Sequence, residues 1–534
     1  MPPSLALLPL LGPVALLAVY FLARRQPGLR PRDVLAASRW ASCLVLLIAL
    51  IAVLATAVQG PATSALIGWN GLGLSVRLDA ISGSLFVLVA FIGVIVLQYS
   101  RNYLDGDPRQ GRFLGGMCLT LAAVIVLVLA GNLFQLVGGW IATSLSLHRL
   151  LVFYRERPAA QVAARKKFII ARISDASLIV AAISLASAFG SSDIATILQR
   201  ASVSVTTPFP IALAALLLAL SAMLKSAQFP THGWLPEVME TPTPVSALLH
   251  AGIINAGGFL IIRFADVMLL FAPSLHVLAI VGGFTALFGA VVMLTQTSVK
   301  VSLAWSTIAQ MGFMLMECGF GAFSIALVHL IAHSLYKAHA FLASGSVVEI
   351  SKTEWQPDLE QGPPVVQVLA SVAMAIGIYV GVSEVFAGLG LFAHDSAAMR
   401  TLGAILIMSL SLLLAQSMRG RAPGPAIVRI ALAAAGATTA YFILQTAAAS
   451  VLSSTLPPIP VPSTAGLAIM LLAGLSFFGV TLLQILAPAR TNRAGWRAAR
   501  VHLENGLYAN VIFNRLVGAL RPPAQAAHYR RERS

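Results

Sequence analysis

The chain has 534 residues, of which 58% are apolar and only 10% charged, and its formal net charge is +16. Soluble domains carry about 25% charged residues, so this composition excludes a soluble globular protein. The positive charge does not indicate nucleic acid binding, because it lies mainly in alternate loops between apolar runs and in the C-terminal tail.

Apolar runs of about 18–25 residues recur along the chain, and each can cross the bilayer core as an α-helix. We predict an all-α polytopic membrane protein with about 15 transmembrane helices. The first run lacks a basic region before it and a small-residue cleavage site, so we expect a retained span rather than a signal peptide. The predicted spans are 4–23, 39–58, 80–98, 114–130, 132–154, 168–189, 208–228, 243–264, 275–297, 299–318, 321–348, 364–388, 398–417, 425–450 and 464–487.

Basic residues separate the loops into two sets. The positive-inside rule places the basic set in the cytoplasm, which puts the N-terminus outside and the C-terminus inside a bacterial cytoplasmic membrane. The other set of loops contains only Arg77, Arg200, Arg263 and Arg400. The basic set contains Arg24, Arg25, Arg30, Arg32, Arg39, Arg101, Arg109, Arg112, Arg149, Arg155, Arg157, Arg165, Lys166, Lys167, Arg172, Arg419 and Arg421.

Proline- or glycine-interrupted segments follow Lys225 and surround Gly377 to Gly381. Broken helices in corresponding positions favour two inverted repeats of about five helices around a pathway at mid-membrane. We expect N-terminal spans over 1–113, a first repeat over 114–264, a second repeat over 275–417, further spans over 425–487 and a basic amphipathic tail over 488–534.

The tail contains arginines at 490, 493, 497, 500, 515, 521, 530, 531 and 533, and Leu503, Leu507, Val511, Ile512 and Leu516 fall near helical spacing. It is either a solvated basic tail held by anionic membrane lipid or a docking surface for a cytoplasmic partner. No hydrophilic loop exceeds about 25 residues, so we expect a transport subunit without enzymatic chemistry of its own.

Ionisable residues inside the apolar runs are the candidate ion pathway, because they are costly in lipid. Lys225 ends a span; it either snorkels to the interface or lies buried with a movable proton. Asp175 is its candidate counter-charge, with Arg172 one turn before it. His250 follows the Pro242–Pro244 break and is either a packing residue or a proton relay.

A second charged run places His329, His333 and Lys337 on one helix face, whereas His339 points elsewhere. A proton wire suits this face better than a metal, since no carboxylate or cysteine completes a ligand shell and Lys337 would repel a cation. Glu384 ends another span and is either buried or interfacial, and we expect Glu317 and Asp79 at the interface. Cys43, Cys118 and Cys318 have no paired spacing, so they predict neither a zinc nor an iron–sulfur site.

The runs KSAQFPTHGWLPEVMETPTPVSALLHAG, VKVSLAWSTIAQMGF and HLIAHSLYKAHAFLASGSV resemble the antiporter-like subunits of respiratory complex I, above all the L subunit, from about Leu78 to Val348. The resemblance implies inverted repeats with a lysine-centred proton half-channel in each. It assigns Lys225, Asp175 and His250 to the first half-channel, and His329, His333 and Lys337 to the central connection.

Three positions depart from that family. Ile141 stands where a glutamate would pair with the first lysine, and Val382 and Ser383 stand where the second repeat has a lysine and an aspartate, leaving only Glu384. The long lateral helix of the L subunit has no counterpart before residue 534. These departures make a proton pump with both half-channels doubtful.

The departures and the run HLENGLYANVIFNRL resemble the membrane B subunits of bacterial Dab inorganic-carbon accumulation complexes. That resemblance implies a subunit driven by an ion gradient, with a proton as the expected ion, which energises CO2 conversion to bicarbonate in a large cytoplasmic partner like a β-carbonic anhydrase. Zinc is expected in that partner, and no cofactor in this chain. The alternatives are a pump subunit of complex I or a hydrogenase, a subunit of a sodium/proton antiporter, and a non-transporting anchor.

Overall fold

The computed structural model describes residues 5–69, 71–154, 156–345, 365–391, 396–417, 424–486 and 494–519. Within these residues, thirteen helices are long and apolar enough to cross a membrane. The chain is therefore a multi-pass, all-α membrane protein, as its composition predicts. The basic positions 155, 419, 421, 490, 493, 521, 530, 531 and 533 lie outside the described residues.

Helices occupy each of the predicted spans. The two predicted spans that are not among the thirteen hold α5 and the shorter apolar helix α8. The main helices are α1 Leu11–Arg25, α2 Arg32–Gln59, α3 Ala80–Tyr103, α4 Gln110–Val128, α5 Leu133–Leu151, α6 Pro158–Phe189, α8 Phe209–Lys225, α10 Thr243–Leu248, α11 Ala256–Arg263, α13 Ala272–Met293, α14 Val299–Gly319, α15 Phe323–Leu342, α17 Val365–Gly388, α18 Ala397–Ser417, α19 Gly424–Leu452 and α20 Thr464–Leu486.

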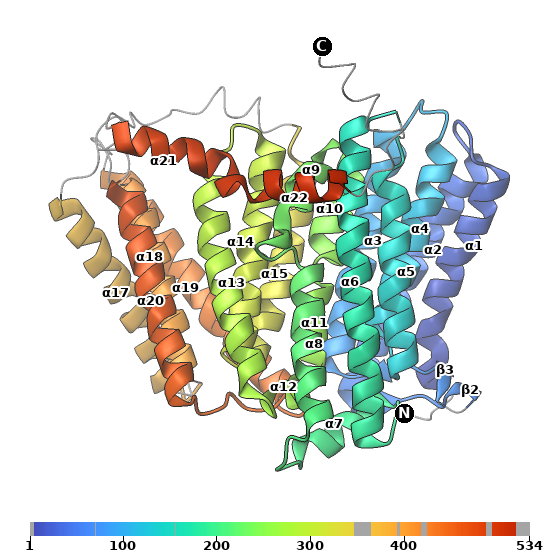
Figure 1. Cartoon of the computed structure of the whole chain (residues 1–534), viewed down its shortest axis with the longest axis horizontal. Helices are drawn as coiled ribbons and strands as arrows, with labels where there is room; N and C mark the ends of the chain where they lie inside the picture. Colours follow the sequence, from blue (N-terminus) through green and yellow to red (C-terminus); the bar gives the residue numbers. More distant parts are fainter. Residues whose placement is uncertain are drawn as a thin grey trace.

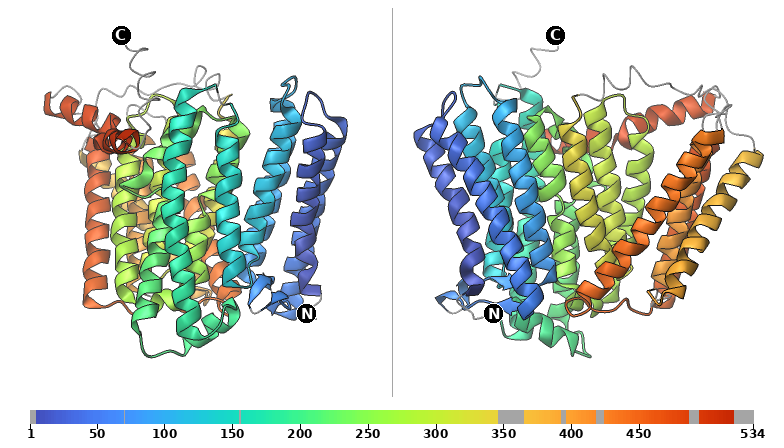
Figure 2. Two further views of the ribbon diagram at one scale, coloured as in Figure 1. Left: turned by 45° about the vertical axis from the view of Figure 1, so that its right-hand side comes forward. Right: turned by 180° about the vertical axis from the view of Figure 1, so that it is seen from behind.

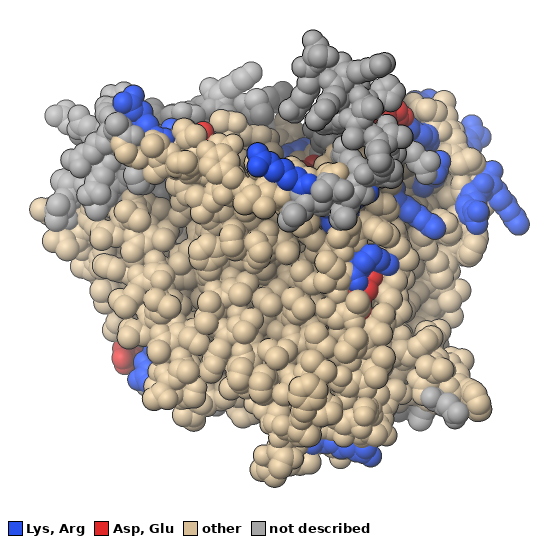
Figure 3. Space-filling model, in the orientation of Figure 1, with Lys and Arg blue, Asp and Glu red and all other residues tan. Residues whose placement is uncertain are grey.

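The spans form one bundle in which α1 to α6 lie at one side, α13 to α15 in the middle and α17 to α20 at the other side (Figure 1). Two helices of the tail, α21 (Ala494–Glu504) and α22 (Ala509–Ala519), lie across one end of the bundle. The first described residues lie at the opposite end, together with α7 (Ile194–Ser202) and α12 (Ala265–Leu269), as Figure 2 also shows. Lysine and arginine gather mainly at the end that carries α21 and α22 (Figure 3).

The interruption after Lys225 is present. Short helical turns occupy the segment that follows α8, including a 3-10 turn (Thr231–Gly233) and α9 (Trp234–Glu237). The next span begins with α10 and contains a π-helical turn (Leu249–Ile253) before α11. The π-helical turn lies within a span, and such irregular backbone is tolerated at membrane depth only where protein buries it.

The predicted interruption around Gly377 to Gly381 is wrong. Helix α17 runs without a break through both glycines. Glycine lowers helix stability by only about 1 kcal/mol in water, and a bilayer offers the backbone no competing water, so the helical hydrogen bonds persist. Of the two proposed broken helices, the structure contains the one after Lys225.

A short segment between α2 and α3 forms strands that the sequence analysis did not predict. They pair as two antiparallel ladders at the end of the bundle opposite α21, and their bounds are β1 Ala62–Thr63, β2 Ile67–Trp69, β3 Leu72–Leu74 and β4 Arg77–Leu78. Directly after β4, Asp79 accepts a hydrogen bond from Ser82 N and caps α3. Its carboxylate also pairs with Arg77 and with Arg263 of α11.

Asp79 is fully buried, so its expected interfacial position is wrong. The arginine that compensates its charge comes from a helix far along the chain, and this pairing makes burial of the carboxylate tolerable. The ion pair joins the start of α3 to the end of α11, the helix that follows the π-helical turn carrying His250.

Candidate ion pathway

Lys225 lies at the end of α8 and is buried, with 8% of its surface exposed. Its Nζ donates to the carbonyl oxygen of Trp140 at 3.3 Å and lies 4.3 Å from the centroid of the Trp140 ring. The side chain therefore does not snorkel to the interface. Its partner on α5 is a neutral carbonyl and an aromatic face, one residue before Ile141.

Asp175 on α6 is also buried, but its ion pair is with Arg172, at 2.6 Å. No hydrogen bond joins Asp175 to Lys225 among the described residues, although their charges are near enough to interact. Asp175 therefore balances the charge of Arg172 as well as that of Lys225, and its close contact is with Arg172.

Lys167 is a functional candidate that the sequence analysis placed in a basic loop. Helix α6 (Pro158–Phe189) begins nine residues before Lys167, and the side chain is buried beside α5. Its Nζ donates to the carbonyl oxygen and to Oγ of Ser144, at 2.7 and 2.9 Å. Its charge interacts with those of Lys225 and Asp175. We call Lys167, Arg172, Asp175 and Lys225 the lysine cluster.

A cavity of about 20 Å3 lies beside the lysine cluster. Lys167 and Lys225 both line it, and Leu249, Ile253 and Ile254 close its other side. This volume is enough for one water molecule, which needs about 10–15 Å3. The cavity therefore extends from the two lysines to the π-helical turn that carries His250.

His250 is fully buried in that π-helical turn. Its Nδ1 is 2.9 Å from Oγ1 of Thr307 on α14, and its ring stacks on Phe341 of α15 at 4.3 Å between centroids. Its Nε2 has no hydrogen-bond partner among the described residues. A buried imidazole with one satisfied nitrogen and one available nitrogen can accept or pass a proton.

Lys337 and His333 lie on the face of α15 that meets α14. Lys337 Nζ donates to Oγ of Ser306 at 2.7 Å and to the carbonyl oxygen of Leu303 at 3.2 Å. His333 Nδ1 is 2.5 Å from Oε1 of Gln310. The structure thus supplies polar partners from one face of α14, because residues three and four apart on a helix share a face.

His329 continues the same face of α15, with its ring centroid 6.3 Å from that of His333. Its Nδ1 is 2.9 Å from Oε2 of Glu317, which is buried. The expected interfacial position of Glu317 is therefore wrong, because a histidine on the neighbouring helix compensates the carboxylate. We call His250, Lys337, His333, His329 and Glu317 the central row.

Glu384 is not joined to the central row. It is exposed on α17, and it forms no hydrogen bond or ion pair with any other described residue. Its neighbours Val382 and Ser383 are partly exposed. The carboxylate at the end of the central row is Glu317, which was not among the pathway residues predicted from the sequence.

The C-terminal helix contacts the broken segment directly. Lys166 is fully buried on α6 and donates to Oε2 of Glu237 at 2.5 Å and to Oδ1 of Asn510 at 2.9 Å. Asn510 Nδ2 in turn donates to Oε1 of Glu237 at 2.6 Å. We call these three residues the C-terminal junction, and they connect α22 with α9 and with the helix that carries Lys167.

The predicted apolar face of the tail is only partly buried. Leu503 and Phe513 pack against the core of the bundle, whereas Leu507, Val511 and Ile512 are exposed. The tail therefore docks on the bundle and still presents apolar side chains outward. Within the described residues, no group of three or more His, Cys, Asp or Glu side chains could hold a metal ion.

Two protein families match the chain. The family described as the transmembrane part of NADH:quinone oxidoreductase and Mrp antiporter subunits matches residues 130–354, which include both the lysine cluster and the central row. The N-terminal family of chain 5 of NADH-ubiquinone oxidoreductase (complex I) matches residues 69–114. The antiporter-like character of the chain is thereby confirmed.

Curated relatives cover more of the chain. A probable inorganic carbon transporter subunit DabB2 of Halothiobacillus neapolitanus is 36% identical over 453 residues, which are 84% of this chain and 81% of that protein. A probable inorganic carbon transporter subunit DabB of Hydrogenovibrio crunogenus is 48% identical over 287 residues, and the match spans 53% of this chain and about half, 55%, of that relative.

A solved structure supports the fold. The structure of an Mrp complex from Dietzia sp. contains a chain similar to this one, with a TM-score of 0.58 and 24% identity, covering 98% of this chain and 58% of that one. The proteins named in these comparisons are described as transporter subunits or as parts of a complex.

Proposed function

Since the chain belongs to the family of DabB inorganic carbon transporter subunits, we propose that it is the ion-conducting membrane subunit of a bacterial inorganic-carbon accumulation complex. The ion is a proton, and CO2 conversion to bicarbonate takes place in a large cytoplasmic zinc partner like a β-carbonic anhydrase. The N-terminus faces the outside and the C-terminus the cytoplasm. The basic end of the bundle, which carries α21 and α22, supports this orientation.

One observation carries the proposal: the lysine cluster and the central row are two sets of mostly buried ionisable side chains on adjoining helices, and the cavity beside the two lysines is also lined by Leu249 and Ile253 of the π-helical turn that carries His250. Buried charges in a membrane protein generally face a pathway, because lipid-facing charge costs several kcal/mol. Here every member of the central row has a polar partner on α14 or α15.

Protons enter through the lysine cluster. Lys167, Arg172 and Lys225 surround a single carboxylate, so release of one proton from a lysine removes a buried like-charge contact. Lysine can serve in this way and arginine cannot, because arginine keeps its proton in proteins. The proton passes through the cavity to His250 and on along Lys337, His333 and His329.

The energy of the gradient reaches the partner through the C-terminal junction. One charge that crosses 100 mV releases about 2.3 kcal/mol, which biases a balanced equilibrium roughly 50-fold. Glu237 and Lys166 lie between the lysine cluster and α22, so a charge change in the cluster alters the position of a helix on the cytoplasmic face. Such coupling acts in both directions, so partner binding also changes ion affinity.

The test compares Lys225→Ala and Lys225→Arg in the complete complex. Both variants should assemble with the partner, and both should lose carbon accumulation, because Arg keeps the charge without releasing a proton. Full activity of Lys225→Arg would refute proton transfer by this side chain. Full activity of both variants would make the chain an anchor, and cation exchange in vesicles without the partner would make it an antiporter subunit.

A further inference from the structure

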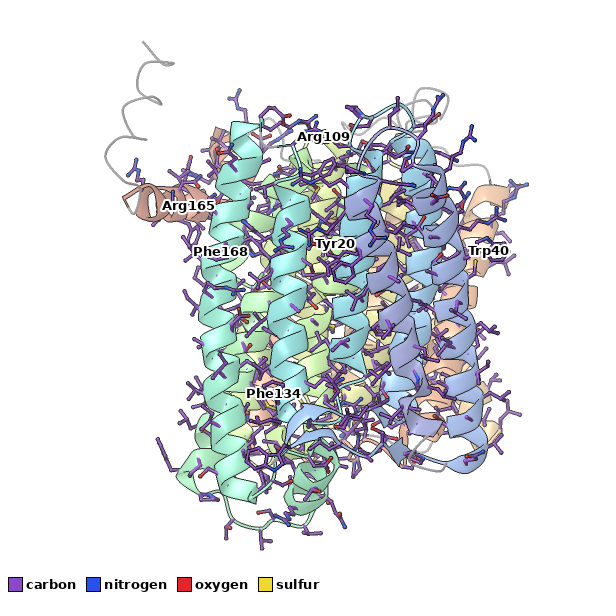
Figure 4. The ribbon with its side chains drawn as sticks, turned by 90° about the vertical axis from the view of Figure 1, so that its right-hand side faces the viewer. Tyr20, Trp40, Arg109, Phe134, Arg165 and Phe168 are labelled. Carbon is purple, nitrogen blue, oxygen red and sulfur yellow. The ribbon has the colours of Figure 1, made fainter. Side chains whose placement is uncertain are left out.

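A cavity of about 860 Å3 opens at the basic end of the bundle, between α1, α4 and α5. Figure 4 shows the side of the molecule that contains it, with Arg109 near the end of the bundle and Tyr20 deeper along α1. No residue of the lysine cluster, the central row or the C-terminal junction lines this cavity. It is therefore separate from the proposed ion pathway.

Four arginines converge on the cavity from three helices and the loop before α4: Arg24, Arg109, Arg112 and Arg149. Arg109 donates to Glu156 at 3.0 Å, and Arg149 is 3.5 Å from the hydroxyl of Tyr20. Within the described residues, Arg24, Arg112 and Arg149 have no carboxylate partner. The cavity thus has three more positive charges than its one acidic side chain balances.

Part of the cavity wall is apolar. Leu119 of α4 and Leu150 of α5 line it, and Gly115 and Gly116 form the close approach of α4 to its neighbours. A Cβ atom on Gly115 would lie 2.6 Å from Cβ of Ala23, and one on Gly116 would lie 2.9 Å from Leu150. The helices are therefore in contact here, and the cavity combines four arginines with apolar wall residues at the end of the spans.

We propose that this cavity, which we call the arginine pocket, binds the phosphate group of an anionic phospholipid. Guanidinium groups bind phosphate oxygens through paired hydrogen bonds, and basic pockets between spans on the cytoplasmic side bind such headgroups. The volume is more than fifty times the ~10–15 Å3 that one water molecule needs in a cavity, so it suits a headgroup with part of an acyl chain better than a single small oxyanion. The apolar wall provides the contact for that chain.

Free phosphate offers the same chemistry as a lipid phosphate, so the experiment separates the two sources. The full chain is placed in nanodiscs of zwitterionic lipid, and binding of cardiolipin, of phosphatidylglycerol and of inorganic phosphate is measured for the wild type. The same measurements are made on Arg24→Gln, Arg112→Gln and Arg149→Gln, singly and combined. Arg39→Gln is the matched control, because Arg39 lies on α2 at the same end and does not line the pocket.

Each arginine removed should weaken phospholipid binding about fivefold, and Arg39→Gln should leave it unchanged. Leu119→Trp, which fills the apolar wall and keeps every charge, should also weaken it. Binding that the arginine variants and Leu119→Trp leave intact would overturn the proposal. Binding of inorganic phosphate alone would overturn the lipid as its source, and loss of a co-purifying protein with unchanged lipid content would assign the arginines to a protein contact instead.

Discussion

Lys225 Nζ lies 4.3 Å from the ring centroid of Trp140 and 3.3 Å from its carbonyl oxygen. In the complex I subunits that this chain resembles, a glutamate at the position of Ile141 would hold this lysine. An aromatic face binds an ammonium group by about 0.5–2 kcal/mol, which is weaker than a buried ion pair. The weaker partner leaves Lys225 able to release its proton without leaving a carboxylate unpaired.

The indole also stabilises the charged, proton-carrying form of Lys225, so its removal should slow proton uptake by the lysine cluster. We expect Trp140→Leu to lower proton flux about fivefold, the equivalent of roughly 1 kcal/mol of lost cation–π contact. Trp140→Phe keeps an aromatic face and should retain most of the flux. Flux is measured with a pH-sensitive dye in vesicles that contain the whole complex, and equal flux in both variants would contradict a role for the ring.

The contact between Ser306 and Lys337 should be visible in a double-mutant cycle. Ser306→Ala leaves the buried Lys337 ammonium with the Leu303 carbonyl as its remaining partner, which should cost about 1–3 kcal/mol of stability. In a Lys337→Met background the same serine change should cost less than about 0.5 kcal/mol, because the contact is already gone. Thermal unfolding of the four proteins in detergent measures this, and additive losses would contradict the contact.

The contacts of the C-terminal junction indicate that Asn510, rather than Asn514, attaches α22 to the bundle. Asn510 Nδ2 donates to Glu237 at 2.6 Å and its Oδ1 accepts from Lys166, whereas Asn514 Nδ2 reaches Glu237 only at 3.4 Å. Asn510→Ala should speed hydrogen exchange of the α22 amides about tenfold or more, since loss of one buried polar contact is worth about 1–3 kcal/mol. Asn514→Ala is the control on the same helix and should change exchange little. Equal effects would mean that apolar packing alone holds α22.

Most spans were predictable from the sequence, because run length and cost of charge in lipid are local properties. Lys225, His250 and the row on α15 were predictable for the same reason. Lys167 was not, because its partner Ser144 lies on α5 and the two residues before it in sequence, Arg165 and Lys166, are basic. Ser306 and Gln310 carry no charge, so their roles emerge only when α14 meets α15.

Burial of acidic residues depends equally on distant partners. Asp79 and Glu317 lie near helix ends, where interfacial exposure is the reasonable expectation. Arg263 and His329 pair with these carboxylates from other helices. Neither pairing can be recognised from the residues next to Asp79 or Glu317 in the sequence. At Gly377 the local sequence predicted a break that is absent. Glycine weakens helices in water, but α17 continues through this residue.

His232, outside the spans, should make stability depend on pH. It lies among aromatic rings of Phe229, Phe288 and Trp305, and burial lowers its pKa from 6.5 to about 4. Because the unfolded chain binds the proton more tightly, this stability is complete above pH 6.5 and is lost as pH falls toward 4, by about 3 kcal/mol in total. His232→Phe keeps the ring packing and removes the titration.

Thermal unfolding of wild type and His232→Phe at pH 7 and pH 5 measures the difference. The wild type should lose about 2 kcal/mol more than the variant over this interval, since the unfolded state titrates near 6.5. The same loss in both proteins would mean that other groups govern acid sensitivity. At pH 7 the variant should be at least as stable, because Nδ1 of His232 has no hydrogen-bond partner among the described residues.

Substitutions at Glu317 and Glu384 test which carboxylate ends the pathway. Glu317 is buried and accepts from His329, whereas Glu384 is exposed on α17 without a described partner. Glu317→Gln should lower carbon accumulation about tenfold or more, the scale of one charged hydrogen bond of roughly 1.5–3 kcal/mol, and Glu384→Gln should leave it within about twofold. The reverse result would place the end of the path at Glu384, in the half-channel that the resemblance implies for the second repeat, on the side of the bundle formed by α17 to α20.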